Sequence, residues 1–551
     1  MPFSHLRQKP FNLDDAAISW VQNTLNSLSI DERIAQTFTL LSRGGTEADL
    51  TELATLQPGG ITRFFTGTAQ SETAFIAAYA KAAKVPPLIS ADLEGSRMSL
   101  PFGTQVLNPL GLAAVNDAAA TREISRIMAE EAVAVGVNWS FTPVIDINHA
   151  WRSAIVGTRG FGSDVATIEA QAMTQIEVFQ AHGVAATVKH WPGEGYDDRD
   201  QHLVTTVNPL SMPEWENTYG RLYRHAIADG VLSIMSAHIA LPSFIRNQTP
   251  GATLEAFRPA SLSHDLNIRL LREKLGFNGL IVSDATPMGG FGAWCKREEA
   301  VVQCLNSGCD IILFSDNPSQ DMAWVKAALV SGALTHARLD DAVTRILGLK
   351  AALGLHKTKA KAHTAFATPT NVAAAQKITQ RAPTLVKDTQ NLLPLSPARH
   401  KRVLVFTTGV VEPFMPQPAG LALIDMLRNE GFEVTVHTPE TEISRQHFDL
   451  ILYLFAEETL LTRSRIFIDW MKLTGTFFKA MKRYWHDIPC AMISFGYPYY
   501  LYDAPRIPTY INAYSTLDTV QAATLECLMG RAAWNTHSPV DPFCGQEDAK
   551  Y

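Results

Sequence analysis

The chain has 551 residues, of which 46% are hydrophobic and 18% charged, and its net charge is −7. This is the composition of an ordinary globular protein with two or three domains, and the negative charge argues against a surface built for nucleic acid or anionic lipid. No stretch of about 20 apolar residues suggests a membrane span, and the first 20 residues lack the apolar run of a signal peptide. We therefore expect a cytoplasmic protein without nucleic-acid or membrane partners.

The six cysteines are scattered and form neither Cys-x-x-Cys pairs nor a spacing suited to zinc. Because cytosolic proteins seldom keep disulfides, we expect reduced thiols that are mostly buried. The sequence predicts neither a metal site nor a cofactor.

The amino-terminal region predicts helices first and then repeated strand–helix units. Residues 12–40 read as two helices, the second opening with the capping box Ser29-Ile30-Asp31-Glu32. Beyond residue 59, short apolar segments alternate with longer Ala-rich amphipathic segments. Seven strands are expected: 60–65, 87–92, 137–143, 184–190, 232–238, 280–284 and 310–314. Such continuous apolar strands are typical of a parallel sheet.

Polar residues at the strand ends favour a closed barrel over an open sheet. Five of them lie at or just after the end of an expected strand: Asp92, Asp146, His190, His238 and Asp284. In a barrel these ends meet around one mouth, whereas an open sheet would spread them along a crevice. We therefore predict a (β/α)8 TIM-like barrel over residues 1–355, closed by a helix that stops at Gly354.

A second domain is expected after a linker. Residues 356–395 form the expected linker, which begins as a Lys, Ala and Thr-rich segment and then includes a helix and a short strand. Over residues 396–551, four apolar segments again alternate with helical ones: 402–407, 432–436, 450–455 and 491–495. This pattern predicts a C-terminal α/β sandwich domain. It contains no G-x-G-x-x-G or Walker sequence, so nucleotide binding is not indicated.

The most informative stretch follows the strand expected at 184–190. It reads Lys189-His190-Trp191-Pro192-Gly193-Glu194-Gly195 and leads into an acid-rich loop that closes on Asp200-Gln201-His202. The glycines let the backbone turn sharply, so the loop can fold a second His over the strand end. Taken alone, the pattern fits a solvated, hydrogen-bonded turn as well as it fits a site.

Further acids and bases lie at other strand ends. Asp284 ends an apolar strand, where a carboxylate is costly unless it is used or paired. Asp92, Glu94 and Arg97 follow a second strand, and Arg159 lies in a Gly-rich loop. Such a cluster suits a neutral, polyhydroxylated ligand, and glycosyl transfer needs a carboxylate nucleophile and a proton donor.

These motifs together resemble glycoside hydrolase family 3, in its β-N-acetylhexosaminidase branch. They occur in the family's order within the first 355 residues: Asp92-x-Glu94-Gly95-x-Arg97, Phe141-x-Pro143-Val144-x-Asp146, Arg159-x-Phe161-Gly162, Lys189 to Gly195 with Asp200-x-His202, Met235-x-Ala237-His238, Ser283-Asp284-x-x-x-Met288 and the helix from Arg345 to Leu355. The second domain resembles the family's C-terminal α/β sandwich more loosely.

The resemblance implies a retaining mechanism. Asp284 would attack the anomeric carbon, and His202, oriented by Asp200, would protonate the leaving oxygen and later activate water. This Asp-x-His dyad, in place of a second carboxylate, assigns the chain to its branch. The residues implied to hold the sugar are Asp92, Arg159, Lys189 and His190. Asp146 would brace the site, and His238 would either bind substrate or pack.

Two positions depart from the family pattern. Leu100 stands where the hexosaminidases usually carry a further Arg, and Glu194 stands where the turn often has His. Recognition of N-acetylglucosamine is therefore left open, while the cleavage groups are all present. The acidic loop from Glu194 to Asp200 is expected to disfavour an anionic aglycone unless Arg199 offsets it.

The leading hypothesis is a cofactor-independent exo-β-N-acetylglucosaminidase that acts on a carbohydrate substrate. A β-glucosidase on the same scaffold remains an alternative, as does a glycoside phosphorylase, since a His does not repel phosphate as a carboxylate would. A non-catalytic sugar-binding protein is the alternative from another class, and the intact Asp284, Asp200 and His202 argue against it. The sequence leaves the oligomeric state open, together with the part that the second domain plays at the site.

Overall fold

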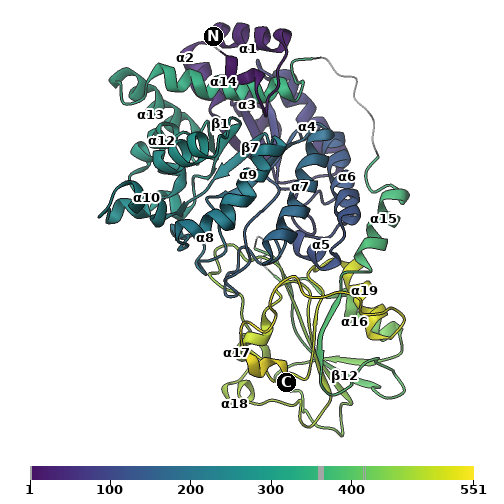
Figure 1. Cartoon of the computed structure of the whole chain (residues 1–551). Coiled ribbons are helices and arrows are strands. Elements are labelled where there is room, and N and C mark those ends of the chain that lie inside the picture. The colour runs from purple at the N-terminus through teal and green to yellow at the C-terminus, as the bar shows by residue number, and fades with distance from the viewer. Residues whose placement is uncertain (1–2, 358–364, 414, 416) are drawn as a thin grey trace.

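The structure is a computed structural model that describes residues 3–357, 365–413, 415 and 417–551. The chain forms two parts, an amino-terminal barrel wrapped in helices and a smaller sheet domain packed against one end of it (Figure 1). No helix in these described ranges is both long and apolar enough to cross a membrane. All six cysteines are free thiols, and five of them are buried.

Eight parallel strands close into a barrel in the order β1-β10-β9-β7-β5-β4-β3-β2. They are β1 (Phe38–Ser42), β2 (Gly60–Arg63), β3 (Leu88–Ala91), β4 (Trp139–Ser140), β5 (Ala185–Trp191), β7 (Ser233–Ser236), β9 (Leu280–Ala285) and β10 (Ile311–Leu313). Their side chains are buried almost throughout, because the barrel interior packs against one face and the helices against the other. The predicted TIM-like barrel is confirmed.

The first barrel strand is missing from the sequence prediction. The prediction of two helices over residues 12–40 is wrong at its end, because α1 (Asp15–Ser27) and α2 (Ile30–Gln36) are followed by β1. One residue separates α2 from β1, so the apolar side chains of the strand read as a continuation of the helix. The capping box predicted at Ser29 is present.

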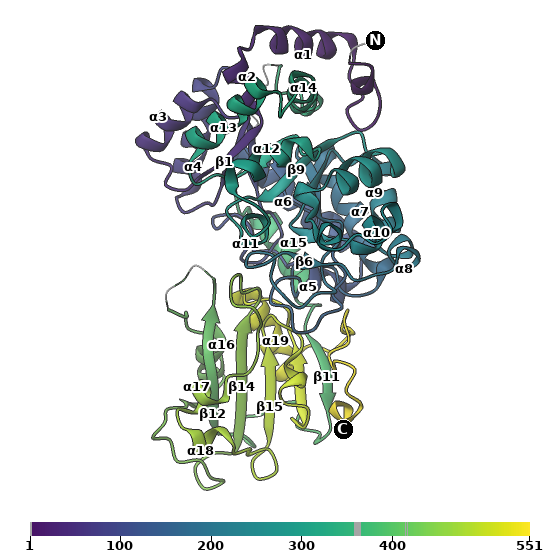
Figure 2. The same cartoon turned by 90° about the vertical axis from the view of Figure 1, so that its left-hand side faces the viewer.

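Helices surround the barrel on its outside (Figures 1 and 2). They are α3 (Glu47–Leu56), α4 (Ala69–Ala82), α5 (Pro109–Val115), α6 (Ala118–Val135), α7 (Val165–Ala181), α8 (Met212–Asn217), α9 (Tyr219–Asp229), α10 (Pro242–Gln248), the π-helix Asp265–Lys274, α11 (Gly289–Gly292), α12 (Arg297–Asn306), α13 (Pro318–Ser331) and α14 (His336–Ala352). Two short strands, β6 (Thr206–Val207) and β8 (Ile239–Ala240), pair with each other outside the barrel.

The second part is a six-stranded sheet in the order β11-β16-β15-β14-β12-β13. Its strands are β11 (Thr384–Asp388), β12 (Arg402–Val411), β13 (Glu433–Val436), β14 (Leu450–Glu457), β15 (Cys490–Ser494) and β16 (Thr509–Asn512), and its helices are α15 (Pro369–Thr379), α16 (Ala422–Asn429), α17 (Trp470–Thr474), α18 (Phe477–Ala480) and α19 (Asp518–Leu528). Only the β11–β16 pair is antiparallel. The predicted α/β class of this region is confirmed.

Two strands of this sheet lie outside the four that the sequence predicts there. The edge strand β11, with α15 before it, corresponds to the short strand and the helix expected within the linker, and residues 358–364 of that linker lie outside the described residues. The strand β16 has four residues and carries polar side chains at both ends, so no run of apolar residues marks it in the sequence.

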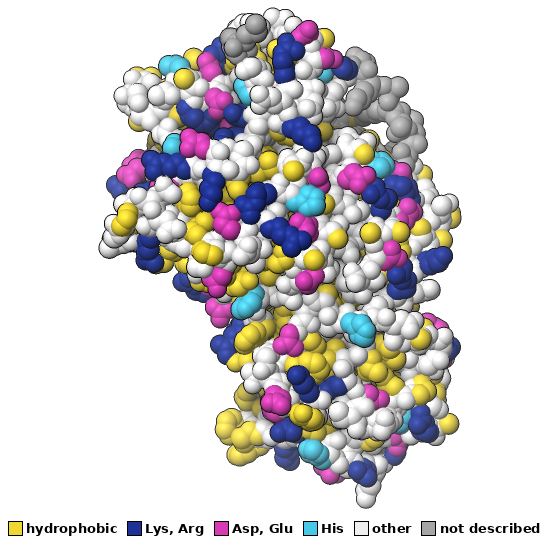
Figure 3. Space-filling model, viewed as in Figure 1, with side chains coloured by type: hydrophobic (Ala, Val, Ile, Leu, Met, Phe, Trp, Pro, Cys, Tyr) yellow, Lys and Arg dark blue, Asp and Glu magenta, His cyan; other side chains and the backbone are white. Residues whose placement is uncertain are grey.

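The carboxyl ends of β12, β14 and β15 point toward the barrel (Figure 2). Backbone and side-chain hydrogen bonds join the two parts there. They run from the Leu460 amide to the Ala154 carbonyl at 3.1 Å and from Asn108 Nδ2 to the Tyr514 carbonyl at 2.7 Å. The loops that follow these strands are therefore held at the mouth of the barrel. On the face shown in Figure 3, basic and acidic side chains are interspersed over both parts rather than gathered by sign.

Candidate active site

A pocket that is open to solvent lies at the carboxyl-terminal mouth of the barrel. Six of the seven predicted site residues line it: Asp92, Arg159, Lys189, His190, His202 and Asp284. The seventh, Asp200, is hydrogen-bonded to His202. The structure therefore brings all the predicted site residues together: Lys189, His190 and Asp284 lie near the ends of β5 and β9, and the others lie in loops.

Asp284 lies near the end of β9 and is almost completely buried, with 8% of its surface exposed. The amide of Ala285 donates to its Oδ1 at 2.7 Å. Burial by itself raises the pKa of this carboxyl, but the imidazoles of His190 and His202 and the amide of Ala285 outweigh it, so the pKa lies below its ordinary value. Asp284 is thus an ionised carboxylate at the pocket, as a nucleophile requires.

His202 and Asp200 form a hydrogen-bonded dyad. Nδ1 of His202 donates to Oδ1 of Asp200 at 2.7 Å, which leaves Nε2 as the ring nitrogen that can exchange a proton. Burial raises the pKa of Asp200, but its bonds to His202 and to the amide of Thr462 outweigh burial and hold the pKa below its ordinary value. The ionised Asp200 therefore fixes both the tautomer and the orientation of the imidazole.

Lys189, Asp92, Glu94 and Arg159 form a largely buried ion cluster that lines the pocket. Nζ of Lys189 lies 2.7 Å from Asp92 Oδ1 and 2.8 Å from Glu94 Oε1. Nε and Nη2 of Arg159 donate to the two oxygens of Glu94 at 2.8 and 2.9 Å. Glu94 thus orients both cations, a role that the sequence did not assign to it. Its place in the Asp92-x-Glu94 motif was the one signal available.

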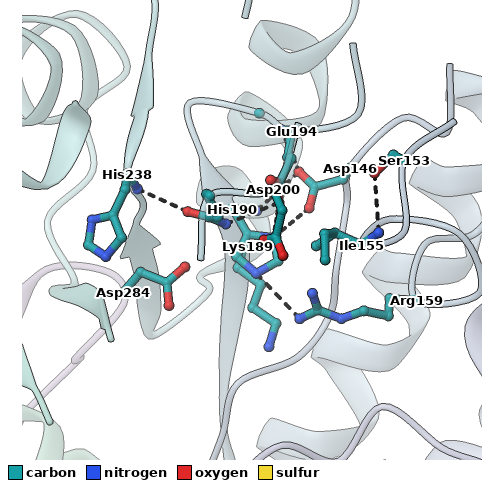
Figure 4. A network of polar contacts seen from close by, with 12 residues as sticks. Asp146, Ser153, Ile155, Arg159, Lys189, His190, Glu194, Asp200, His238 and Asp284 are labelled. Carbon is teal, nitrogen blue, oxygen red and sulfur yellow. Dashed lines mark hydrogen bonds and ion pairs between the residues drawn. The ribbon is translucent and has the colours of Figure 1, made fainter. Parts of the chain in front are cut away.

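His190 is oriented by Asp146 behind the pocket (Figure 4). Its Nδ1 donates to Asp146 Oδ2 at 2.6 Å, and its Nε2 lies 3.4 Å from Arg159 Nη2. Oδ1 of Asp146 accepts from the backbone amides of His190 and Glu194, at 3.2 and 2.8 Å. The bracing role expected for Asp146 agrees with these contacts.

Asp146, His190 and Glu194 are also the one group of potential metal ligands found together among the described residues. Two ligands of a tetrahedral zinc ion, each about 2.0–2.1 Å from the metal, lie roughly 3.3 Å apart. The separation of 2.6 Å between His190 Nδ1 and Asp146 Oδ2 is that of a hydrogen bond. The geometry therefore fits a hydrogen-bonded pair and not a metal centre.

His238 is fully buried and does not belong to the described pocket lining. Its Nε2 donates to the carbonyl of Ala285 at 3.0 Å, and its Nδ1 then accepts from the hydroxyl of Ser261 at 2.8 Å. Burial lowers its pKa, so the ring is neutral. His238 supports the chain next to Asp284, which corresponds to the packing alternative.

The two departures from the family pattern lie outside the described pocket lining. Leu100 is buried among apolar side chains, and Glu194 lies behind His190 with 3% of its surface exposed. In the loop that follows, Arg199 binds Asp197 through Nε and Nη2 at 2.6–3.1 Å. Arg199 therefore offsets part of the negative charge that the loop carries in the sequence.

The second domain supplies one wall of the pocket. Its lining residues are Val411, Glu412, Pro413, Glu458, Thr459, Leu461 and Thr516. Glu458 accepts from Ser96 Oγ at 2.6 Å and from Asn108 Nδ2 at 3.1 Å, both in the barrel. The amide of Thr462 donates to Asp200 Oδ2 at 2.8 Å. No motif marks these residues in the sequence, and they lie hundreds of residues from their partners.

Comparisons with known proteins cover the whole chain. Residues 29–349 match the family model described as Glycosyl hydrolase family 3 N terminal domain. A protein of Cellulomonas fimi named Beta-N-acetylglucosaminidase/beta-glucosidase is 38% identical over 98% of this chain and 99% of its own length. A Beta-hexosaminidase of Methylobacillus flagellatus is 33% identical over 36% of this chain and 53% of its own length.

Solved structures are also similar to this chain over nearly its whole length. One named Beta-glucoside phosphorylase BglX bound to 2FGlc is 34% identical, covers 99% of this chain and 100% of its own, and superposes with a TM-score of 0.92. A family 3 β-N-acetylglucosaminidase from Paenibacillus sp. str. FPU-7 is 22% identical, with a TM-score of 0.80 over 94% of this chain and 99% of its own. The latter likeness shows a shared two-domain fold.

Proposed function

Because the chain belongs to glycoside hydrolase family 3, a glycosidase family acting on β-linked sugars, we propose that it removes a terminal β-linked N-acetylglucosamine or glucose with retention of configuration. The observation that carries this proposal is the presence, in one pocket, of the buried, ionised Asp284 and of the Asp200–His202 dyad. A carboxylate nucleophile and a separate proton donor are the two groups that such a reaction requires.

In the first step a carboxylate oxygen of Asp284 bonds to the anomeric carbon while the bond from that carbon to the leaving oxygen breaks. His202 gives its Nε2 proton to the leaving oxygen, and the aglycone departs as an alcohol. In the second step His202 takes a proton from water, the water oxygen bonds to the anomeric carbon, and Asp284 is released as a carboxylate. Asp200 stabilises the imidazolium form that His202 has before the first step and regains in the second.

The sugar is held by the ion cluster and by His190. Asp92, Lys189, Arg159 and His190 line the pocket and offer carboxylate, ammonium, guanidinium and imidazole groups to sugar hydroxyls. Because Leu100 is buried outside the lining, no Arg from that position reaches a 2-acetamido group, which favours tolerance of glucosides alongside N-acetylglucosaminides. The name of the Cellulomonas fimi relative, which combines both activities, supports the same breadth.

A panel of aryl β-glycosides with and without the 2-acetamido group tests the sugar preference. We expect turnover of both the glucoside and the N-acetylglucosaminide. Turnover of neither, by a folded protein that still binds sugar, would favour the non-catalytic alternative.

Phosphorolysis is the second candidate, and two observations favour it. The acid/base is a His, which does not repel an incoming phosphate as a carboxylate would, and a full-length structural relative at 34% identity is named a phosphorylase. In this variant the phosphate oxygen, in place of water, bonds to the anomeric carbon. Turnover with and without inorganic phosphate decides between them, because phosphorolysis yields a sugar 1-phosphate and hydrolysis yields the free sugar.

A further inference from the structure

Gln201, which separates the two members of the acid/base dyad in sequence, is a buried anchor of the loop that carries them. It has 1% of its surface exposed. Its Nε2 donates to Glu194 Oε2 at 3.0 Å, and its Oε1 accepts from the amide of His238 at 3.0 Å. Its backbone carbonyl accepts from the amide of Gly290 at 3.1 Å. One residue therefore ties the loop to the segments that follow β5, β7 and β9.

Other polar contacts also hold the loop: the amide of Thr462 donates to Asp200 Oδ2 at 2.8 Å, and the amide of Gly289 donates to the carbonyl of His202 at 2.8 Å. Between the end of β5 and the start of β6 it has no regular secondary structure, and Asp198, Arg199, Leu203 and Val204 are exposed. Because it has no regular secondary structure, its conformation depends on such polar contacts, and Gln201 makes three of them. The side chain of Glu194, three residues after the end of β5, links Gln201 to the turn that follows Lys189 and His190.

Glu194 is placed to hold Gln201 and is not placed to contact the substrate. It lies outside the described pocket lining, and its Oε1 has no hydrogen-bond partner among the described residues. Burial and the nearby Asp146 raise its pKa well above the ordinary value, which favours the protonated, neutral carboxyl. A neutral oxygen can remain buried without a partner at far lower cost than a carboxylate oxygen, and the other oxygen still accepts from Gln201.

We propose that Glu194 is a positioning residue for acid/base catalysis, which acts through Gln201 to hold Asp200 and His202 where proton transfer occurs. This inference rests on the proposed function, because it requires His202 to be the acid/base. The competing role runs through His190, whose Nδ1 lies 3.5 Å from Glu194 Oε2 and which contacts the sugar in the proposed function. The two roles predict different kinetics, because proton donation matters only when the leaving group needs it.

The test compares Glu194→Ala with the unaltered enzyme on aryl β-glycosides whose leaving groups range from dinitrophenol to phenol. We expect kcat/KM to fall about 10- to 100-fold for phenol, a share of the roughly 10²–10⁴-fold that acid–base catalysis supplies, and by less than about threefold for dinitrophenol. Added azide, which needs no general base, is expected to raise the turnover of the dinitrophenyl glycoside and to yield the β-glycosyl azide. Glu194→Gln, which keeps an acceptor for Gln201, is expected to recover the leaving-group dependence of the unaltered enzyme.

A loss of kcat/KM that is equal for all leaving groups and appears in KM would overturn the inference in favour of the role through His190. Unchanged kinetics would also overturn the inference. Gln201→Leu tests the same link if Glu194→Ala does not fold, with the same pattern expected. Glu131, a buried Glu that binds Thr104 far from the loop, gives the matched control, because Glu131→Ala should lower stability without changing the leaving-group dependence. His202→Ala is measured in parallel: if it too shows no leaving-group dependence, the proposed function itself fails.

Discussion

At the scale of single residues, the site is built from charges that neutralise one another below the pocket surface. Glu94 shows this most clearly, because burial raises its pKa and the cations Arg159 and Lys189 outweigh burial and lower it. Removing one member of such a buried group leaves its partners uncompensated. The proposed sugar-binding face therefore depends on a residue that does not need to touch the sugar hydroxyls itself.

We predict that Glu94→Gln lowers kcat/KM by about 30-fold or more, since uncoupling a buried charge costs roughly 2–5 kcal/mol, and that it lowers the Tm as well. Arg159 and Lys189 would share only Asp92 as a counter-ion within the cluster. Kinetics and thermal melts measure both effects. Glu412→Gln, at the solvent-exposed side of the pocket, is the control, and equal effects of the two substitutions would refute the role of Glu94.

The lowered pKa of Asp284 makes a prediction about pH. A carboxyl whose pKa in the folded state lies below its ordinary value of 3.8 contributes stability that is present above that pH and is lost as the pH falls through the folded-state pKa. The nucleophile therefore stays ionised down to about pH 4. For a dinitrophenyl glycoside, which needs no proton donor, we expect the rate of glycosyl-enzyme formation to stay level from pH 7 to about pH 4.5. A decline centred near pH 6 would contradict the assignment.

At the scale of the elements, the residues at the strand ends were the most useful for predicting the fold and the site from the sequence. Apolar runs predicted seven of the eight barrel strands, and the polar residues after them predicted the barrel mouth. The strand β1 was read as helix because α2 ends only one residue before it, and β16 was missed because its four residues mix polar and apolar types. Short strands next to helices or turns carry too little pattern to separate from their neighbours.

The helix α14 carries a buried titratable group that the site does not use. Lys350 is fully buried, its Nζ donates to Gln36 Oε1 at 2.7 Å, and burial lowers its pKa to about 7. Between about pH 7 and the ordinary pKa of 10.5, the unfolded chain binds a proton that the folded chain does not, so this residue makes the protein more stable as the pH rises.

We therefore predict that Lys350→Met raises the Tm relative to the unaltered protein at pH 6 and that this advantage shrinks steadily toward pH 10. Paired thermal melts across this range measure the effect. A Tm difference that does not vary with pH would show that Lys350 is charged or neutral in both states alike.

At the scale of the whole molecule, the second domain completes the site. Glu458 links Ser96 and Asn108 of the barrel to Thr516 of the second domain, and the amide of Thr462 holds Asp200 of the proposed acid/base dyad. The seven candidate site residues could be predicted from the sequence because each lies in a motif near a strand end. The pocket wall from the second domain and the role of Gln201 could not be predicted, because they arise from contacts between segments that carry no motif.

We predict that Glu458→Ala lowers the Tm by about 3–6 °C and raises KM, because four donors lose a charged acceptor at the contact between the domains. Glu412→Ala, whose carboxylate makes one long ion pair with Arg97 at 3.4 Å, is the control and should change the Tm little. Equal shifts for the two variants would show that Glu458 does not join the domains.

The central claim is that Asp284 forms a covalent glycosyl-enzyme in this pocket, and trapping that species tests it most directly. After incubation with dinitrophenyl 2-deoxy-2-fluoro-β-glucoside, intact-protein mass spectrometry should show one added fluorosugar, and peptide mapping should place it on Asp284. Asp284→Asn should acquire none. An adduct on another residue, or steady turnover of ordinary glycosides by Asp284→Asn, would contradict the account.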